Sequence, residues 1–313
     1  MKIFLIGKIG SINHWLEDIA GALRSAGHEV QFGVTRHTWL NARLECALTP
    51  LIVARLTARV AAVQPDLILA VGGYHTPPAV LAALRAMPIR PPIAGWVGDQ
   101  FAPALQGTAD LYDLVGYTDT GLLAQHRCLR FAARALYLPH AVDARRASAR
   151  PPADRKPGMV FIANPTPHRR EVVDALAQPI SVYGPGWAPS TTVAHDIHRR
   201  RLAADALAGV YARHTAALNI HNELNVVHGL NQRNFDPCLT QTLVVAEDQP
   251  DLALCFEPGR EVVVYADPAN LNDLHARLIK DAPWAAKIAR QGRRRVLAEH
   301  TFEHRLAALM AAL

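Results

Sequence analysis

Short apolar segments that alternate with longer amphipathic ones constrain the fold of this chain more than any other feature. In the first half the apolar segments are KIFLIG (2–7), EVQFGV (29–34), DLILAVGG (66–73), PIAGWVGD (92–99), LVGYTD (114–119) and ALYLPH (135–140). Such continuous apolar runs indicate buried strands. Between the first two, Leu16, Ile19 and Leu23 recur at helical spacing before Gly27, a predicted C-terminal cap. The alternation predicts an α/β protein with parallel sheets and crossover helices.

The alternation breaks at residues 143–158 (DARRASARPPADRKPG), a polar, basic and proline-rich segment. This composition is typical of a linker or an exposed connection. The alternation then resumes with GMVFIAN (158–164), PISVYGPG (179–186), AALNIHN (216–222), TLVVAED (242–248) and EVVVYAD (261–267). With 313 residues, 50% of them hydrophobic, the chain can bury two ordinary cores. We therefore predict two domains in tandem, residues 1–148 and 149–313.

The chain is moderately basic, with a formal net charge of +6. This excess is compatible with anionic ligands, an anionic membrane surface or nucleic acid. The clearest basic run, Arg293 to Arg295, lies in a helical stretch without interleaved aromatic residues. We interpret it as a solvated helix face, and we expect no nucleic-acid partner. Peripheral contact with a membrane remains open.

The cysteines and the first residues indicate a cytoplasmic protein. The four cysteines have neither CxxC spacing nor histidine partners at zinc-site intervals, which favours a reducing compartment. The run MKIFLIGKIG is broken by Gly7 and Gly10, so it supports neither a signal peptide nor a membrane span. Its GKIG turn also differs from the G-x-G-x-x-G fingerprint, which counts against a nicotinamide or flavin enzyme.

Polar residues follow the predicted strands of the second half. Ligands of open α/β sheets bind beyond the carboxyl ends of the strands. These ends carry Asn164 with PTPHRR (165–170), GPGW (184–187), His221 with Asn222, and GLNQRNFDPCL (229–239). The polar groups supply hydrogen bonds and positive charge, while the glycines let the backbone approach a flat ring. The set is suited to a phosphorylated nucleoside.

Several of these motifs together resemble one enzyme family. The pattern G-x-N-x-R-x-F-D (229–236), FEPGREVVVYADP (256–268) and RRRVLAEHTFEHR (293–305) is similar to CgeB-type spore-maturation glycosyltransferases of group 1. VFIANPTPHRRE (160–171) and YGPGW (183–187) resemble the same family, whereas the first half matches it only loosely. The resemblance implies the GT-B fold, with two facing Rossmann-like domains and a C-terminal helix that returns toward the first.

The resemblance also implies an activity. A GT-B enzyme of this kind moves a sugar, here most simply a hexose, from a nucleotide-sugar donor on the C-terminal domain to an acceptor facing the first domain. The acceptor class stays open between a glycan, a protein, a lipid and a small molecule, and the oligomeric state is not indicated. No D-x-D pair follows a predicted strand. Because arginines and helix N-termini can offset the leaving-group charge, we expect neither a metal nor another cofactor.

Three residues of the 229–239 segment take donor-binding roles by this resemblance. Asp236 occupies the position of an acidic residue that holds the ribose, where two acceptor oxygens match a vicinal diol. Arg233 is the candidate for the diphosphate, with Asn231 orienting the same phosphates. Relatives carry Glu in place of Asp236, which is shorter by about 1.5 Å, and a second acid where His228 stands.

The remaining binding candidates are Asn164, Arg169, Tyr183, Gly184, Gly186 and His221. Arg169 and Arg170 begin a predicted helix, and adjacent helical residues point apart, so at most one faces a ligand. His221 either touches the diphosphate or sugar or is a satisfied structural histidine. Tyr183 either stacks on the base or belongs to the core.

His14 and Asp99 are the catalytic candidates of the first domain. His14 follows the first turn, and Asp99 follows the strand PIAGWVG, so either could accept a hydroxyl proton from the acceptor. Both are also residue types that cap helices and form turns. A second function class stays open, a catalytically weak or inactive nucleotide-sugar-binding protein, because Asp236 and His228 depart from the family pattern.

Overall fold

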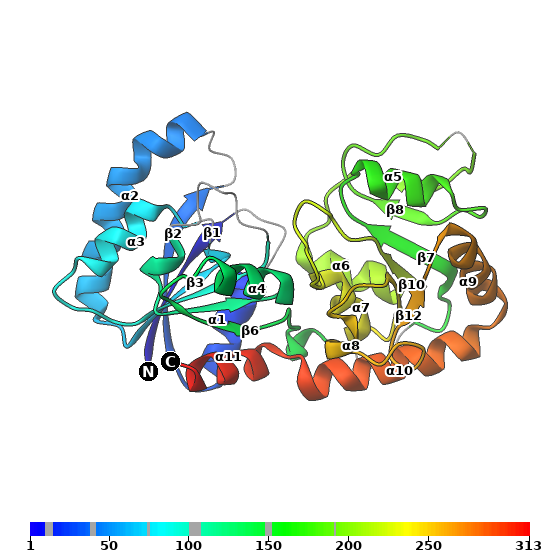
Figure 1. Cartoon of the computed structure of the whole chain (residues 1–313). Coiled ribbons are helices and arrows are strands. Elements are labelled where there is room, and N and C mark those ends of the chain that lie inside the picture. The colour runs from blue at the N-terminus through cyan, green and yellow to red at the C-terminus, as the bar shows by residue number, and fades with distance from the viewer. Residues whose placement is uncertain (10–14, 38–41, 74–75, 100–107, 148–151, 191) are drawn as a thin grey trace. The chain divides into compact units, whose positions relative to one another are not determined.

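The computed structural model describes residues 1–313 except 10–14, 38–41, 74–75, 100–107, 148–151 and 191 (Figure 1). The chain forms two compact units, one of Met1–Pro139 with Phe302–Leu313 and the other of His140–Thr301. Each unit contains a six-stranded sheet. Every strand pair in both sheets is parallel, as the alternating sequence pattern predicts.

The first unit is built on a sheet of order β2-β1-β3-β4-β5-β6. Its strands are β1 (Lys2–Ile9), β2 (Glu29–His37), β3 (Leu67–Val71), β4 (Ile93–Val97), β5 (Leu114–Tyr117) and β6 (Arg134–Tyr137). Its helices are α1 (Trp15–Ser25), α2 (Ala42–Val63), α3 (Pro78–Arg85), α4 (Thr120–Cys128) and α11 (Phe302–Ala311). All residues of β3, β4 and β5 are buried, which explains why these strands are apolar throughout rather than alternating.

The C-terminal helix α11 returns to the first unit, as the family resemblance implied. It lies against α1. The ring of Phe302 packs edge-on against Trp96, with centroids 5.9 Å apart. Arg305 is buried, and its Nε donates to the carbonyl of Pro139 at 2.9 Å. The core of this unit therefore includes residues from both ends of the sequence.

The second unit is built on a sheet of order β12-β11-β10-β7-β8-β9. Its strands are β7 (Lys156–Ile162), β8 (Ser181–Tyr183), β9 (Asp196–His198), β10 (His214–Asn219), β11 (Leu243–Glu247) and β12 (Val263–Tyr265). Its helices are α5 (Pro167–Asp174), α6 (Ala204–Ala212), α7 (Asp236–Leu239), α8 (Leu252–Cys255), α9 (Pro268–Lys280) and α10 (Ala282–Glu299), with short 3-10 turns η3 (Ala144–Arg146) and η4 (Gln232–Asn234). Among the described helices of either unit, none is long and apolar enough to cross a membrane.

The basic segment 143–158, expected as the linker, lies within the second unit. The division falls between Pro139 and His140, and β7 already begins at Lys156. Asp143 is buried, and its carboxylate lies 2.8 Å from Arg145 and 3.5 Å from Arg146. These arginines neutralise the buried charge of Asp143, whereas residues 152–154 and 156–157 are exposed, as the composition of the segment predicted.

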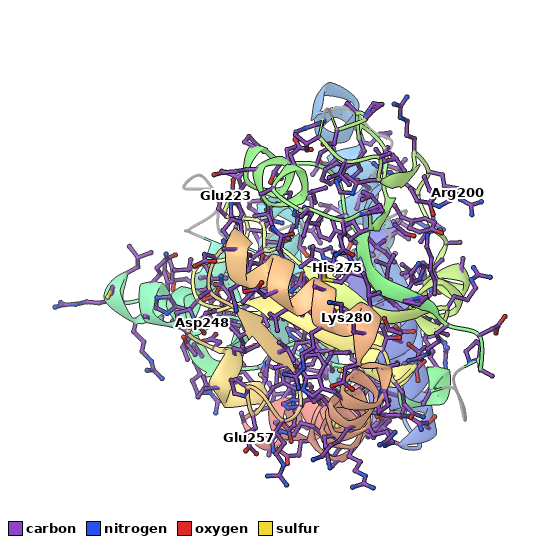
Figure 2. The ribbon with its side chains drawn as sticks, turned by 90° about the vertical axis from the view of Figure 1, so that its right-hand side faces the viewer. Arg200, Glu223, Asp248, Glu257, His275 and Lys280 are labelled. Atoms are coloured by element: carbon purple, nitrogen blue, oxygen red, sulfur yellow. The ribbon has the colours of Figure 1, made fainter. Side chains whose placement is uncertain are left out.

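His275 is a buried histidine on α9 (Figure 2). Within the described part of the chain, neither Nδ1 nor Nε2 of its ring is bonded. Gly158 on β7 makes room for the ring, because a Cβ there would lie 2.8 Å from Nε2. Burial, and then the nearby His195, lowers the pKa of His275 to about 4.

This low pKa predicts a cost of acidification. In the unfolded chain His275 has the ordinary histidine pKa of about 6.5, so between pH 6.5 and 4 it binds a proton there but not in the folded chain. The free energy of unfolding therefore decreases as the pH falls from about 6.5 toward 4. In His275→Leu, we expect the free energy of unfolding to decrease by up to about 3 kcal/mol less than in wild type over this pH range. Denaturant unfolding near neutral pH and at acidic pH measures it, with His304→Leu on the exposed surface as control. Equal pH slopes for wild type and His275→Leu would contradict the prediction.

Candidate functional site

The carboxyl edge of the second sheet collects polar side chains from several segments. Strands β10, β7 and β11 are neighbours in that sheet, with β10 in the middle. Because they are parallel, their carboxyl ends meet at one edge. Asn164 follows β7, His221 follows β10, and Glu247 ends β11. Helix α5, which starts just after Asn164, adds His168 and Arg169 to the same edge.

Arg169 is a buried cation with one unused hydrogen-bonding group. Its side chain is 4% exposed; Nε donates to the carbonyl of Ile220 at 3.2 Å and Nη1 to that of Asn164 at 3.0 Å. Among the described residues, its Nη2 has no partner. Burial, and then the charge of Arg233, lowers the pKa of Arg169 to about 9. The guanidinium therefore keeps one buried N–H group that no described residue satisfies.

The neighbouring Arg170 points away from Arg169, toward the loop after β8. Its Nη2 donates to the carbonyl of Gly186 at 2.7 Å, and its guanidinium lies over the ring of Trp187. Arg170 therefore holds the loop after β8 through its contacts with Gly186 and Trp187.

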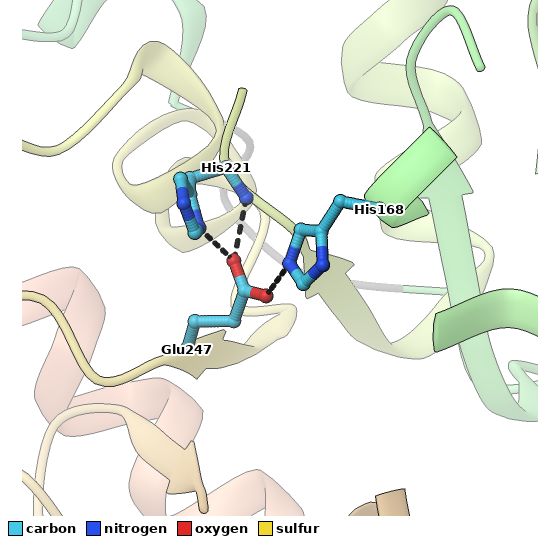
Figure 3. Close-up of side chains that lie close together, drawn as sticks. All are labelled: His168, His221 and Glu247. Atoms are coloured by element: carbon cyan, nitrogen blue, oxygen red, sulfur yellow. Dashed lines mark hydrogen bonds and ion pairs between the residues drawn. The ribbon is translucent and has the colours of Figure 1, made fainter. Parts of the chain in front are cut away.

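Glu247 receives three donors at the same edge (Figure 3). Its Oε2 accepts the backbone N–H of His221 at 2.7 Å and also lies in hydrogen-bond contact with Nδ1 of that ring. Its Oε1 lies 2.5 Å from Nε2 of His168. Burial would raise the pKa of Glu247, but the hydrogen bonds from His221 and His168 bring it below its usual value. The same contact raises the pKa of His221.

Neither Glu247 nor His168 was among the residues predicted from sequence. Glu247 closes the apolar run TLVVAE, and His168 lies within PTPHRR. The signal that could have found them is the strand-end rule itself, applied to every polar residue at this edge.

A network of three asparagines ties the 229–239 segment to the end of β10. Buried Asn219 donates from Nδ2 to Oδ1 of Asn234 at 2.6 Å. Its Oδ1 accepts from Nδ2 of Asn231 at 3.1 Å and from Nε of Arg233 at 3.4 Å. Oδ1 of Asn231 accepts the backbone N–H of Arg233 at 2.9 Å and so caps η4. Asn231 thus shapes the loop that carries Arg233, while Asn219 and Asn234 were missed from sequence.

Asp236 is the first residue of α7 and is half-buried. Its Oδ1 accepts from Nε2 of Gln232 at 2.7 Å, and that amide group also donates to the carbonyl of Ala141. Burial, and then the charge of Asp236, raises the pKa of the buried Tyr211. The carboxylate of Asp236 therefore lies at the start of α7, in contact with the neutral amide of Gln232.

The loop after β8 is shaped by glycine. Gly184 has φ +151°, and a Cβ there would lie 2.2 Å from the carbonyl oxygen of Ala163. That carbonyl also accepts from Nε1 of Trp187 at 2.7 Å. Tyr183 is 8% exposed and stacks on the ring of His198 at 4.1 Å. Gly186, at φ +85°, supplies the carbonyl that Arg170 binds. The close approach at Gly184 is thus to the chain itself, and Tyr183 packs as a core residue.

The two catalytic candidates belong to the first unit. Asp99 follows β4 and is half-buried. His14 lies outside the described residues. Their catalytic role stays a prediction.

The described residues contain one grouping of three potential metal-ligand atoms. These atoms, from His168, His221 and Glu247, lie within 4.8 Å of one another. In the structure the two histidine nitrogens contact the two carboxylate oxygens directly. The grouping can therefore hold either protons or a cation, and the charges around it decide between them.

The C-terminal part of the chain matches a known family by sequence. Residues 168–311 match the model of the family described as glycosyl transferase-like, a little less than half of the chain. No curated protein matches the sequence significantly.

Solved structures share the fold of the whole chain. Sucrose-phosphate synthase from Thermosynechococcus elongatus is similar with a TM-score of 0.73 and 15% identity over 100% of both chains. HepE from Anabaena, in complex with UDP-glucose, gives a TM-score of 0.68 and 15% identity over 100% of both chains. A glycosyltransferase from Rickettsia africae gives 0.67 and 10%, over 99% of this chain and 97% of its own. The chain therefore has the two-domain, Rossmann-like α/β fold of GT-B glycosyltransferases, and its residues 168–311 are similar to the glycosyl transferase-like family.

Proposed function

We propose that this chain is a CgeB-type glycosyltransferase that moves a sugar, most simply a hexose, from a nucleotide-sugar donor to an acceptor. The observation that carries the proposal is Arg169 at the carboxyl edge of the second sheet, a buried guanidinium whose Nη2 is bonded by none of the described residues. The family match over residues 168–311 and the fold shared with HepE, whose structure contains UDP-glucose, support it.

The donor diphosphate binds between Arg169, Arg233 and the start of α5. The positive end of a helix and a guanidinium both favour an anion, and their attraction is stronger where water is excluded. When the bond between the sugar and the diphosphate breaks, negative charge grows on the phosphate that leaves. Cations already fixed in place stabilise that charge without reorganising. On this basis the reaction needs no metal ion.

Asp236 binds the ribose of the donor in this proposal. Its contact with Gln232 is between a carboxylate and a neutral amide, which ribose hydroxyls can replace or share. The turn from Gly184 to Gly186 borders the base, whereas Tyr183 is already stacked on His198 and serves the core.

The acceptor binds to the first unit, where Asp99 or His14 takes the proton of the attacking hydroxyl. A carboxylate or imidazole at a strand end suits this task because it can accept a proton near neutral pH.

One observation favours a catalytically weak or inactive nucleotide-sugar-binding protein as the second candidate. His228 stands where relatives carry one acidic residue. At the position of the other acidic residue, the carboxylate of Asp236 accepts a hydrogen bond from Gln232. Such a protein would bind nucleotide sugars without consuming them.

A nucleotide screen followed by donor turnover separates the two candidates. We expect one of UDP, GDP, dTDP and CMP to raise the unfolding temperature, because a ligand of the folded state stabilises it by mass action. The matching nucleotide sugar should then be hydrolysed slowly, at a rate that EDTA does not change. Binding without turnover would favour the inactive binding protein, and binding of none of the four would contradict both candidates.

Arg233→Ala should weaken nucleoside diphosphate binding about ten- to hundredfold, because a charge-assisted hydrogen bond contributes about 1.5 to 3 kcal/mol. Binding of the free nucleoside should stay unchanged. Calorimetric titration measures both, with Arg260→Ala as control, since Arg260 is an exposed arginine paired with Glu257. An equal loss for nucleoside and diphosphate would rule out the phosphate role of Arg233.

Asp99→Asn or His14→Ala should lower turnover about a hundredfold or more while donor affinity is kept, because general-base catalysis contributes about that much. Steady-state rates and donor titration for both variants provide the measurement. Undiminished turnover in both variants would place the base elsewhere, and lost donor binding would show that these residues serve the donor instead.

A further inference from the structure

The ring of His221 is fixed by one carboxylate. Oε2 of Glu247 accepts the backbone N–H of His221 at 2.7 Å and also contacts Nδ1 of its ring, so main chain and side chain are held together. Nε2 of Gln249 lies 3.2 Å from the same ring nitrogen. Among the described residues, Nε2 of His221 has no partner, and the side chain is 23% exposed. With Nδ1 engaged, Nε2 is the nitrogen that can meet a ligand.

The surroundings of His221 carry charges from several elements. Glu247 on β11 raises its pKa through the hydrogen bond, burial opposes this, and exposed Glu223, in the loop after β10, adds to the rise. Arg169 on α5 acts in the opposite direction. His168, also on α5, contacts the other oxygen of Glu247. The carboxylate contact is the largest of these effects, so the protonated ring is favoured above the usual pH range of histidine.

These charges favour an anion over a metal ion at the His168, His221 and Glu247 grouping. The guanidinium of Arg169 donates to the carbonyl of Ile220, in the same peptide group whose N–H reaches Glu247. A dication at the grouping would lie close to this buried positive charge and would have to displace both imidazoles from the carboxylate. A phosphate oxygen instead meets Nη2 of Arg169, which has no partner in the described structure.

We propose that Glu247 is a positioning residue that holds His221 through Nδ1, so that the protonated ring offers its Nε2–H to a phosphate oxygen of the donor beside Arg169. This inference rests on the proposed function for the identity of the ligand. The anion site itself is a property of the free protein. Its consequence is that phosphate binding depends on pH.

The sign of this dependence follows from the charge on the ring. His221 is cationic below its raised pKa and neutral above it. Anion affinity is therefore highest at mildly acidic pH and falls as the pH rises above about 6.5, the ordinary histidine value. A nucleotide with a terminal phosphate would confuse the measurement, because that phosphate titrates in the same range. Sulfate stays dianionic and needs no nucleobase.

The experiment measures sulfate affinity by NMR between about pH 6 and 8, together with the ring nitrogen shifts of His221. We expect the wild-type affinity to fall about five- to tenfold across this range, with chloride at equal ionic strength as the baseline. His221→Gln should bind weakly and without this slope. In Glu247→Gln the titration midpoint of His221 should move to lower pH. His198→Gln is the matched control, because His198 contacts Asp196 at 3.1 Å on β9, and its slope should equal that of wild type.

Three outcomes would overturn the inference. They are a wild-type affinity that does not change with pH, a His221→Gln variant that keeps the wild-type slope, and a His221 midpoint that Glu247→Gln leaves in place. Tight binding of zinc alone, abolished by Glu247→Gln, would assign the grouping to a cation and overturn it as well. His221→Gln and Glu247→Gln test the inference independently, so if one variant fails to fold, the other still provides the test. A protein that shows the sulfate slope but binds no nucleotide would refute the proposed function and keep the anion site.

Discussion

Two oppositely charged side chains form hydrogen bonds with the peptide group between Ile220 and His221. The guanidinium of Arg169 binds its carbonyl, and the carboxylate of Glu247 binds its N–H. Both charged groups are largely withdrawn from water, where either one alone would be costly. Together they fix the chain where it leaves β10, and they also fasten α5 and the end of β11 to that point. The positions of Arg169, Glu247 and His221 in the candidate donor site depend on this arrangement, because all three are bonded at that peptide group.

A second network, of uncharged asparagine side chains, holds the loop that carries Arg233 against the sheet. Asn219, one residue before that peptide group, bonds to Asn231 and Asn234 in the loop that carries Arg233. Each buried amide in this network has found a partner, as buried polar groups require. Arg233 consequently starts from a loop that is tied to the sheet, which reduces the ordering that a bound diphosphate would otherwise have to impose.

The sequence predicted the architecture well because strand burial and helical periodicity are local signals. The apolar runs match the strands of both sheets except the short edge strand β9 (Asp196–His198), and the residues after them lie at the carboxyl edges where α/β proteins bind ligands. It predicted the partners of these residues poorly. Whether Asn231 meets a ligand or Asn219 depends on the register of distant segments, which no local pattern encodes. Composition also did not reveal that Asp143, at the start of segment 143–158, is buried and paired with two arginines.

The chain passes between its two units twice, once near Pro139 and again near Thr301. Phe302 and Arg305 supply packing for Trp96 and a donor for Pro139, so the first unit lacks part of its core until they have been synthesised. During translation, the second unit can therefore complete its sheet while the first is still unfinished. The two units would then finish folding in the reverse of their order in the sequence, with the N-terminal unit last.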